Sequence, residues 1–84
     1  MVLSQWDKLL ERLYNLDRNM RFDDISKILA EIGYKRSQPR RGSSHYTFRK
    51  PYRQPITIPK ENPIKRAYVE LVRDAVILFE SEEI

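Results

Sequence analysis

The sequence predicts an α+β fold: a two-layer sandwich in which helices cover one face of a three-stranded antiparallel sheet. Two observations predict it. Apolar residues recur at helical spacing near both ends of the chain and between residues 22 and 32, which is typical of amphipathic helices. Between residues 34 and 59 polar and apolar residues alternate instead, and prolines and glycine separate the alternating stretches. The expected order is α-α-β-β-β-α.

The first two helices are defined by their starts and apolar stripes. Ser4 is expected as the N-cap of a helix from about Gln5–Leu16, with Trp6 on the stripe that packs against the core. A second helix is expected over 22–32, beginning at Phe22 or the residue after it. Gly33 follows at the position where a left-handed backbone ends many helices.

Three short strands are expected next, at residues 34–37, 44–49 and 54–59. The prolines that bound the third strand favour a position at the edge of the sheet. The segment between the first two strands contains Pro39 and Gly42, which favour a turn.

The last helix is expected to begin at Asn62–Pro63, with asparagine as the N-cap and proline as the first helical residue. It should run to about Glu80, and residues 81–84 should fray. Lys65 and Arg66 would then lie in the first turn, where the helix dipole disfavours cations. Helix N-termini also bind phosphate, so both residues are candidate phosphate ligands.

Composition limits the possible classes of protein. The chain has 84 residues, 40% of them hydrophobic, which predicts one globular domain over residues 1–84. There is no cysteine, so disulfides and thiolate sites are excluded. Neither a signal peptide nor a membrane-spanning stretch is recognisable, and we expect a cytoplasmic protein that does not interact with membranes.

Positive charge is concentrated in the middle of the chain. The net charge is +4, but residues 34–66 alone contain ten Lys/Arg and one Glu, a net charge of +9. Residues 1–33 and 67–84 are net acidic. A solubilising surface would mix the two signs, whereas a clustered positive field indicates a polyanionic partner, most simply a nucleic acid.

The only histidine, His45, lies within this basic stretch. Strand alternation places Tyr46 and Phe48 on the core-facing side, so His45 and Thr47 should face outward. RNA carries its own nucleophile, the 2′-hydroxyl, and an imidazole could serve as the general acid or base. The candidate RNA-binding residues around it are Arg40, Arg41, Ser44, Arg49, Lys50 and Arg53. A surface histidine without a catalytic role remains the alternative.

Metal and cofactor sites are not expected. One histidine without cysteine cannot build a zinc site. The adjacent acids Asp23 and Asp24 are better explained as capping residues at the positive end of a helix. No small-molecule cofactor is implied.

The chain resembles the HicA family, the toxins of HicA–HicB toxin–antitoxin systems, over about residues 20–80. The resemblance rests mainly on Gly42, Ser44 and His45 followed three residues later by Phe48. Many members have one serine where this chain has two. Further similar segments are Phe22–Ile25, Ile32–Tyr34, Ile56–Pro59 and Pro63–Lys65. The first helix lies outside the minimal family domain.

The resemblance implies a double-stranded-RNA-binding-like fold and a metal-free ribonuclease that acts on mRNA. It implies that His45 is catalytic and that a HicB-like antitoxin is the inhibitor. We expect the inhibitor to cover the face bearing His45, Arg49 and Thr57, which is rimmed by Arg40, Arg41 and Lys65. Steric obstruction of RNA from the helical side is the alternative. A non-catalytic RNA-binding module of the same fold is the alternative, because no second acid/base residue is obvious.

Overall fold

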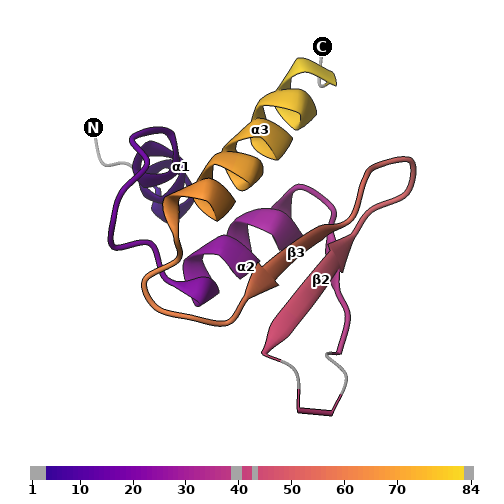
Figure 1. Cartoon of the computed structure of the whole chain (residues 1–84). Coiled ribbons are helices and arrows are strands. Elements are labelled where there is room, and N and C mark those ends of the chain that lie inside the picture. Colours follow the sequence, from indigo (N-terminus) through magenta and orange to yellow (C-terminus); the bar gives the residue numbers. More distant parts are fainter. Residues whose placement is uncertain (1–3, 39–40, 43, 83–84) are drawn as a thin grey trace.

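The computed structural model describes residues 4–38, 41–42 and 44–82. In chain order it contains α1 (Gln5–Tyr14), α2 (Phe22–Glu31), β1 (Lys35–Arg36), β2 (His45–Arg49), β3 (Ile56–Pro59) and α3 (Arg66–Glu82). This α-α-β-β-β-α order confirms the predicted fold class (Figure 1). None of the described helices is long and apolar enough to cross a lipid bilayer.

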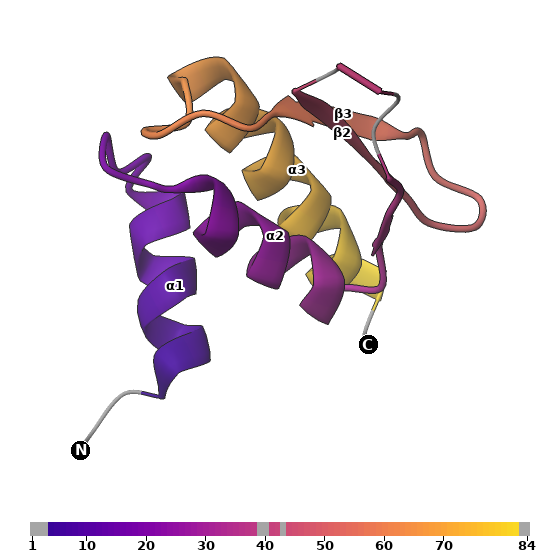
Figure 2. The same ribbon diagram turned by 90° about the horizontal axis from the view of Figure 1, so that it is seen from below.

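The three strands form an antiparallel meander with β2 in the centre. Tyr46 lies opposite Ile58, and Phe48 lies opposite Ile56. These four side chains share one face, because successive strand residues point to opposite sides. Phe48 and the two isoleucines are buried, and Tyr46 is half-buried. The helices lie on this side of the sheet, which gives two layers (Figure 2).

The core fills the space between the sheet and the helices. Phe22 is its aromatic centre, with its ring centroid 5.1 Å from that of Tyr46 and 6.2 Å from that of Phe48. Tilted pairs at such distances contribute about 0.5–1.5 kcal/mol beyond their buried area. The three helices and the segments flanking α2 supply further buried side chains: Leu13, Met20, Ile25, Ile28, Leu29, Ile32, Val69, Val72 and Val76.

Helix α1 is part of this core. The Ser4 hydroxyl accepts a hydrogen bond from the Asp7 amide at 3.1 Å, which confirms the predicted N-cap. The helix ends at Tyr14, two residues earlier than expected, and Leu16 has a left-handed backbone with φ of 53°. Leu13 is completely buried. The additional N-terminal helix therefore packs as an integral element of the domain.

A polar network joins α1 to α2. Arg12 contacts Asp17 at 2.9 Å and Asp24 at 3.4 Å, and it donates to the Asn19 carbonyl at 3.1 Å. The Asn19 amide and Arg12 together lower the pKa of Asp17, while the bond to Asp17 raises the pKa of Arg12. Asp24 also accepts from the Arg21 amide at 3.0 Å, which agrees with the predicted capping role of the acids at this helix start.

The predicted start of the last helix at Asn62–Pro63 is wrong, because α3 begins at Arg66. The Asn62 side chain accepts a hydrogen bond from the amide of Phe22, the first residue of α2, at 2.9 Å. The Ile64 amide donates to the Met20 carbonyl at 2.8 Å. The segment before α3 is therefore hydrogen-bonded to the start of α2. The Asn62 side chain accepts from the first amide of α2 and does not cap α3.

Other boundaries differ by a few residues. Strand β1 is shorter than the expected 34–37, and β3 begins at Ile56, after Pro55, which has no amide proton for the ladder. Helix α3 continues to Glu82, two residues beyond the expected end at Glu80, and residues 83–84 lie outside the described part of the chain. Gly33 follows the C-cap of α2 with φ of 100°, as predicted.

Candidate nucleic-acid interface

The outer face of the sheet is polar. His45, Thr47 and Arg49 alternate with the core residues of β2 and therefore point away from the helices. His45 and Arg49 are exposed, as expected from the sequence, and Thr47 is half-buried. Thr57 lies directly opposite Thr47, with 3.1 Å between the two hydroxyl oxygens. The two threonine hydroxyls therefore lie on the outer face between His45 and Arg49.

Backbone hydrogen bonds fix the start of β2 next to the histidine. The Ser44 carbonyl accepts from the Lys60 amide at 2.7 Å, and His45 lies opposite Pro59 in the ladder. On the other side of β2, the Ser37 amide and hydroxyl both donate to the Thr47 carbonyl, each at 2.9 Å. His45 thus lies on the central strand, which is hydrogen-bonded on both sides.

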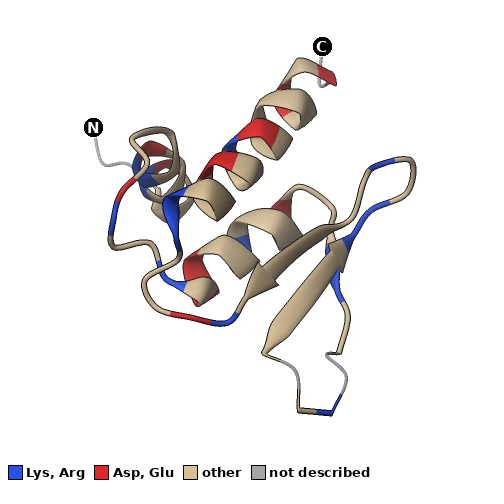
Figure 3. Cartoon of the chain, viewed as in Figure 1, with Lys and Arg blue, Asp and Glu red and all other residues tan. Residues whose placement is uncertain are grey.

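Charge is segregated in space as well as in sequence. Most acidic residues of the described chain lie on the three helices, which also carry basic residues, whereas the strands and the β2–β3 connection carry basic residues and no acidic ones (Figure 3). The positive region predicted from residues 34–66 is therefore concentrated on the sheet half of the molecule.

One predicted RNA-binding residue, Lys50, is used by the fold. Its ammonium donates to the carbonyl of Ile32, at the end of α2, at 2.7 Å. It also lies 4.7 Å from the ring centroid of Phe79 and 5.8 Å from that of Tyr34. The side chain passes over Gly33, where an added Cβ would meet its Cε at 3.3 Å. Lys50 therefore acts as a cap for α2 and packs against α3.

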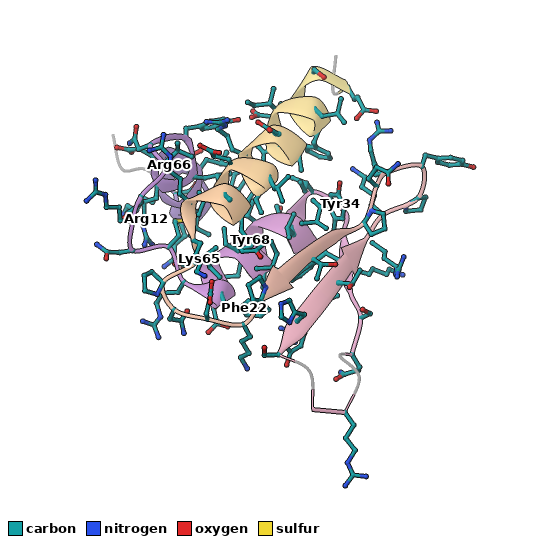
Figure 4. The ribbon with its side chains drawn as sticks, viewed as in Figure 1. Arg12, Phe22, Tyr34, Lys65, Arg66 and Tyr68 are labelled. Carbon is teal, nitrogen blue, oxygen red and sulfur yellow. The ribbon has the colours of Figure 1, made fainter. Side chains whose placement is uncertain are left out.

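Two further predicted cations are paired with acids. Arg53 forms an ion pair with Glu82 and donates to the Tyr52 carbonyl at 2.9 Å, so it fastens the β2–β3 connection to α3. Arg66 forms an ion pair with Glu70 one turn along α3, at 3.1 Å. In Figure 4, Arg66 lies toward α1 and away from the strands.

The remaining predicted residues are exposed or lie outside the described residues. Arg41, Ser44 and Arg49 are exposed. Arg41 lies in the β1–β2 connection, Ser44 immediately precedes β2, and Arg49 is the last residue of β2. Lys65 is exposed immediately before α3, and its carbonyl accepts the first hydrogen bonds of that helix. Arg40 lies outside the described part of the chain. The structure therefore places Arg49 on the same strand as His45 and Ser44 immediately before that strand, but it does not bring Arg66 there.

Three cations near β2 were not predicted. Lys35 lies directly opposite Arg49 in the β1–β2 ladder. Arg36 and Lys60 flank the ring of Tyr46, at 5.1 Å and 5.8 Å from its centroid. The alternation within residues 34–37 could have placed Lys35 on the outer face, but pairing it with Arg49 requires the register, which the sequence does not reveal.

Among the described residues, no group of three or more His, Asp or Glu side chains is close enough to hold a metal ion. The outer face carries one imidazole, two threonine hydroxyls and neighbouring cations. These groups can exchange a proton and attract a phosphate.

Neither a family model, nor a curated protein, nor a solved structure matches the chain. Fold and surface define its class: a small α+β domain with a basic sheet face that carries a single histidine.

Proposed function

We propose that the protein is an endoribonuclease that cleaves mRNA in the cytoplasm, as its resemblance to HicA implies. The observation that carries the proposal is the position of His45, exposed on the same face as Thr47 and Arg49. On this proposal the 2′-hydroxyl of RNA gives its proton to the imidazole, and its oxygen attacks the neighbouring phosphorus. The bond to the 5′-oxygen breaks, and that oxygen takes up a proton.

The surrounding groups support binding of the RNA backbone on this face. Arg49 lies on the same strand and face, and the Thr47–Thr57 hydroxyl pair lies between it and the histidine. Cations attract phosphate oxygens and hold the RNA chain against the face. Because the nucleophile belongs to the substrate, the protein needs to supply only proton transfer and the placement of the RNA.

The test is cleavage of a long unstructured RNA by purified protein in the presence of a chelator. His45→Ala and His45→Gln should keep the fold, measured by circular dichroism, and lose about 10²–10⁴-fold in rate, because the general acid or base is gone. RNA with 2′-deoxy substitutions should bind and remain intact.

Two results would contradict the catalytic assignment. Equal cleavage by folded His45→Ala protein would show that the histidine is not involved. Wild-type protein that binds RNA without cutting it would identify the alternative, a non-catalytic RNA-binding module.

The proposal includes a protein inhibitor similar to HicB. Its binding surface is the face bearing His45, Arg49 and Thr57, so it should present acidic side chains, which favour rapid association with a basic surface. Arg49→Glu should weaken inhibitor binding in calorimetry, whereas Arg18→Glu, in the α1–α2 connection, should not. Equal weakening by both would indicate a non-specific charge effect, and no weakening by Arg49→Glu would place the inhibitor on another surface.

A further inference from the structure

Lys35 and Arg49 form an unusual pair on the outer face of the sheet. They are direct partners in the β1–β2 ladder, so their side chains leave the sheet on the same side. Both are exposed, and none of the ion pairs found among the described residues includes either of them. Like charges directly opposite one another destabilise a sheet. The fold therefore does not explain why both positions are cationic.

The pair lies in line with the histidine. Arg49 is four residues from His45 on β2, which corresponds to about 13 Å along the strand. The Thr47–Thr57 hydroxyl pair occupies the middle of this path. The two threonine hydroxyls therefore lie between the histidine and the two cations. None of the side chains along this path is acidic.

We propose that Lys35 and Arg49 form a second phosphate-binding subsite, which holds an RNA backbone phosphate other than the one cleaved at His45. This inference rests on the proposed ribonuclease function and specifies its substrate. An anion between the two side chains would relieve their repulsion, and ammonium and guanidinium groups are both good phosphate ligands. The substrate is then a chain that follows β2, with phosphates at both ends of the strand.

Binding measurements isolate this subsite from catalysis. In a His45→Gln background, which keeps the RNA intact, Lys35→Gln and Arg49→Gln should each weaken binding of a long unstructured RNA about three- to tenfold. Removing one cation–phosphate interaction should reduce the slope of log affinity against log salt by about 0.7. Arg18→Gln removes the same charge from the α1–α2 connection, remote from β2, and should change neither quantity (Figure 1).

Substrate length provides the second measurement. A dinucleoside monophosphate has a single phosphate and cannot reach both places, so Lys35→Gln should leave its cleavage unchanged. On longer oligoribonucleotides the same variant should raise KM and leave kcat nearly constant, because the lysine–phosphate interaction contributes to binding.

The outcomes separate the two proposals. RNA cleavage with Lys35→Gln and Arg49→Gln indistinguishable from Arg18→Gln would overturn the subsite and leave the ribonuclease intact. That result would also fit an acidic protein segment as the occupant of the pair. RNA binding that depends on Lys35 and Arg49, without cleavage, would support the subsite and overturn the nuclease. Absence of RNA binding would overturn both.

Discussion

Lys50 and Lys35 carry the same charge within the same basic stretch of the chain, but their surroundings are opposite. Lys50 is half-buried, donates to the Ile32 carbonyl and lies against Phe79. Lys35 is exposed and lies opposite another cation, Arg49. The comparison shows that a cluster of basic residues in a sequence contains two kinds of cation. Some cations stabilise the fold, and others lie opposite a like charge, where the fold does not explain them.

The largest expected effect is on Lys50. Lys50→Met keeps much of the packing but loses the hydrogen bond at the end of α2 and the charge over Phe79, so unfolding free energy should fall by about 1–2 kcal/mol. Urea denaturation measures it, and Lys35→Met is the matched control, with no loss expected. If Lys50→Met instead kept full stability and weakened RNA binding, Lys50 would belong to the interface.

A smaller effect of opposite sign is expected on the outer face. Lys35→Gln or Arg49→Gln should raise unfolding free energy by roughly 0.2–0.5 kcal/mol at low ionic strength, because a like-charged cross-strand pair is removed. Salt screens exposed charges, so the gain should shrink at high ionic strength. A loss of stability in either variant would mean that the side chain contributes to the fold.

A third effect concerns the helical half of the molecule and appears only at alkaline pH. Burial, followed by the hydrogen bond to Glu80, raises the pKa of Tyr14 to about 12. The pKa of an unfolded tyrosine is about 10, so between this pH and the pKa of Tyr14 in the folded protein the folded state binds more protons than the unfolded state. Stability should therefore fall as pH rises through this window.

Tyr14→Phe tests this by removing the ionisable group. The variant should lose less stability than wild-type protein between pH of about 10 and about 12. Tyr34, whose pKa burial also raises, is present in both proteins and cancels in the comparison. Parallel stability curves for the two proteins would show that Tyr14 does not contribute.

Predictions from the sequence succeeded where a residue's own neighbours determine its environment. The alternation around Phe48 placed His45 on the outer face because a strand has only two sides. Ser4 was correctly assigned as a cap because its partner, Asp7, is three residues away. The order of the elements followed from the same local periodicities.

Predictions failed where the partner is distant in the chain. Asn62 looked like a cap for the helix that follows it, but its partner is Phe22, forty residues earlier. Lys50 looked like a free cation, but its acceptor is the Ile32 carbonyl. Tertiary packing decides such interactions, and a local pattern contains no information about them.

The packing of α1 against α3 has a consequence for the order in which the protein can form during synthesis. Trp6 and Leu10 lie beside Val76 and Phe79, and Tyr14 is hydrogen-bonded to Glu80. Helix α1 leaves the ribosome before α3, so this part of its packing surface becomes available only after α3 has emerged. We expect incomplete chains to lack a finished core, so that the complete fold with its basic sheet face arises only when translation has passed Glu80.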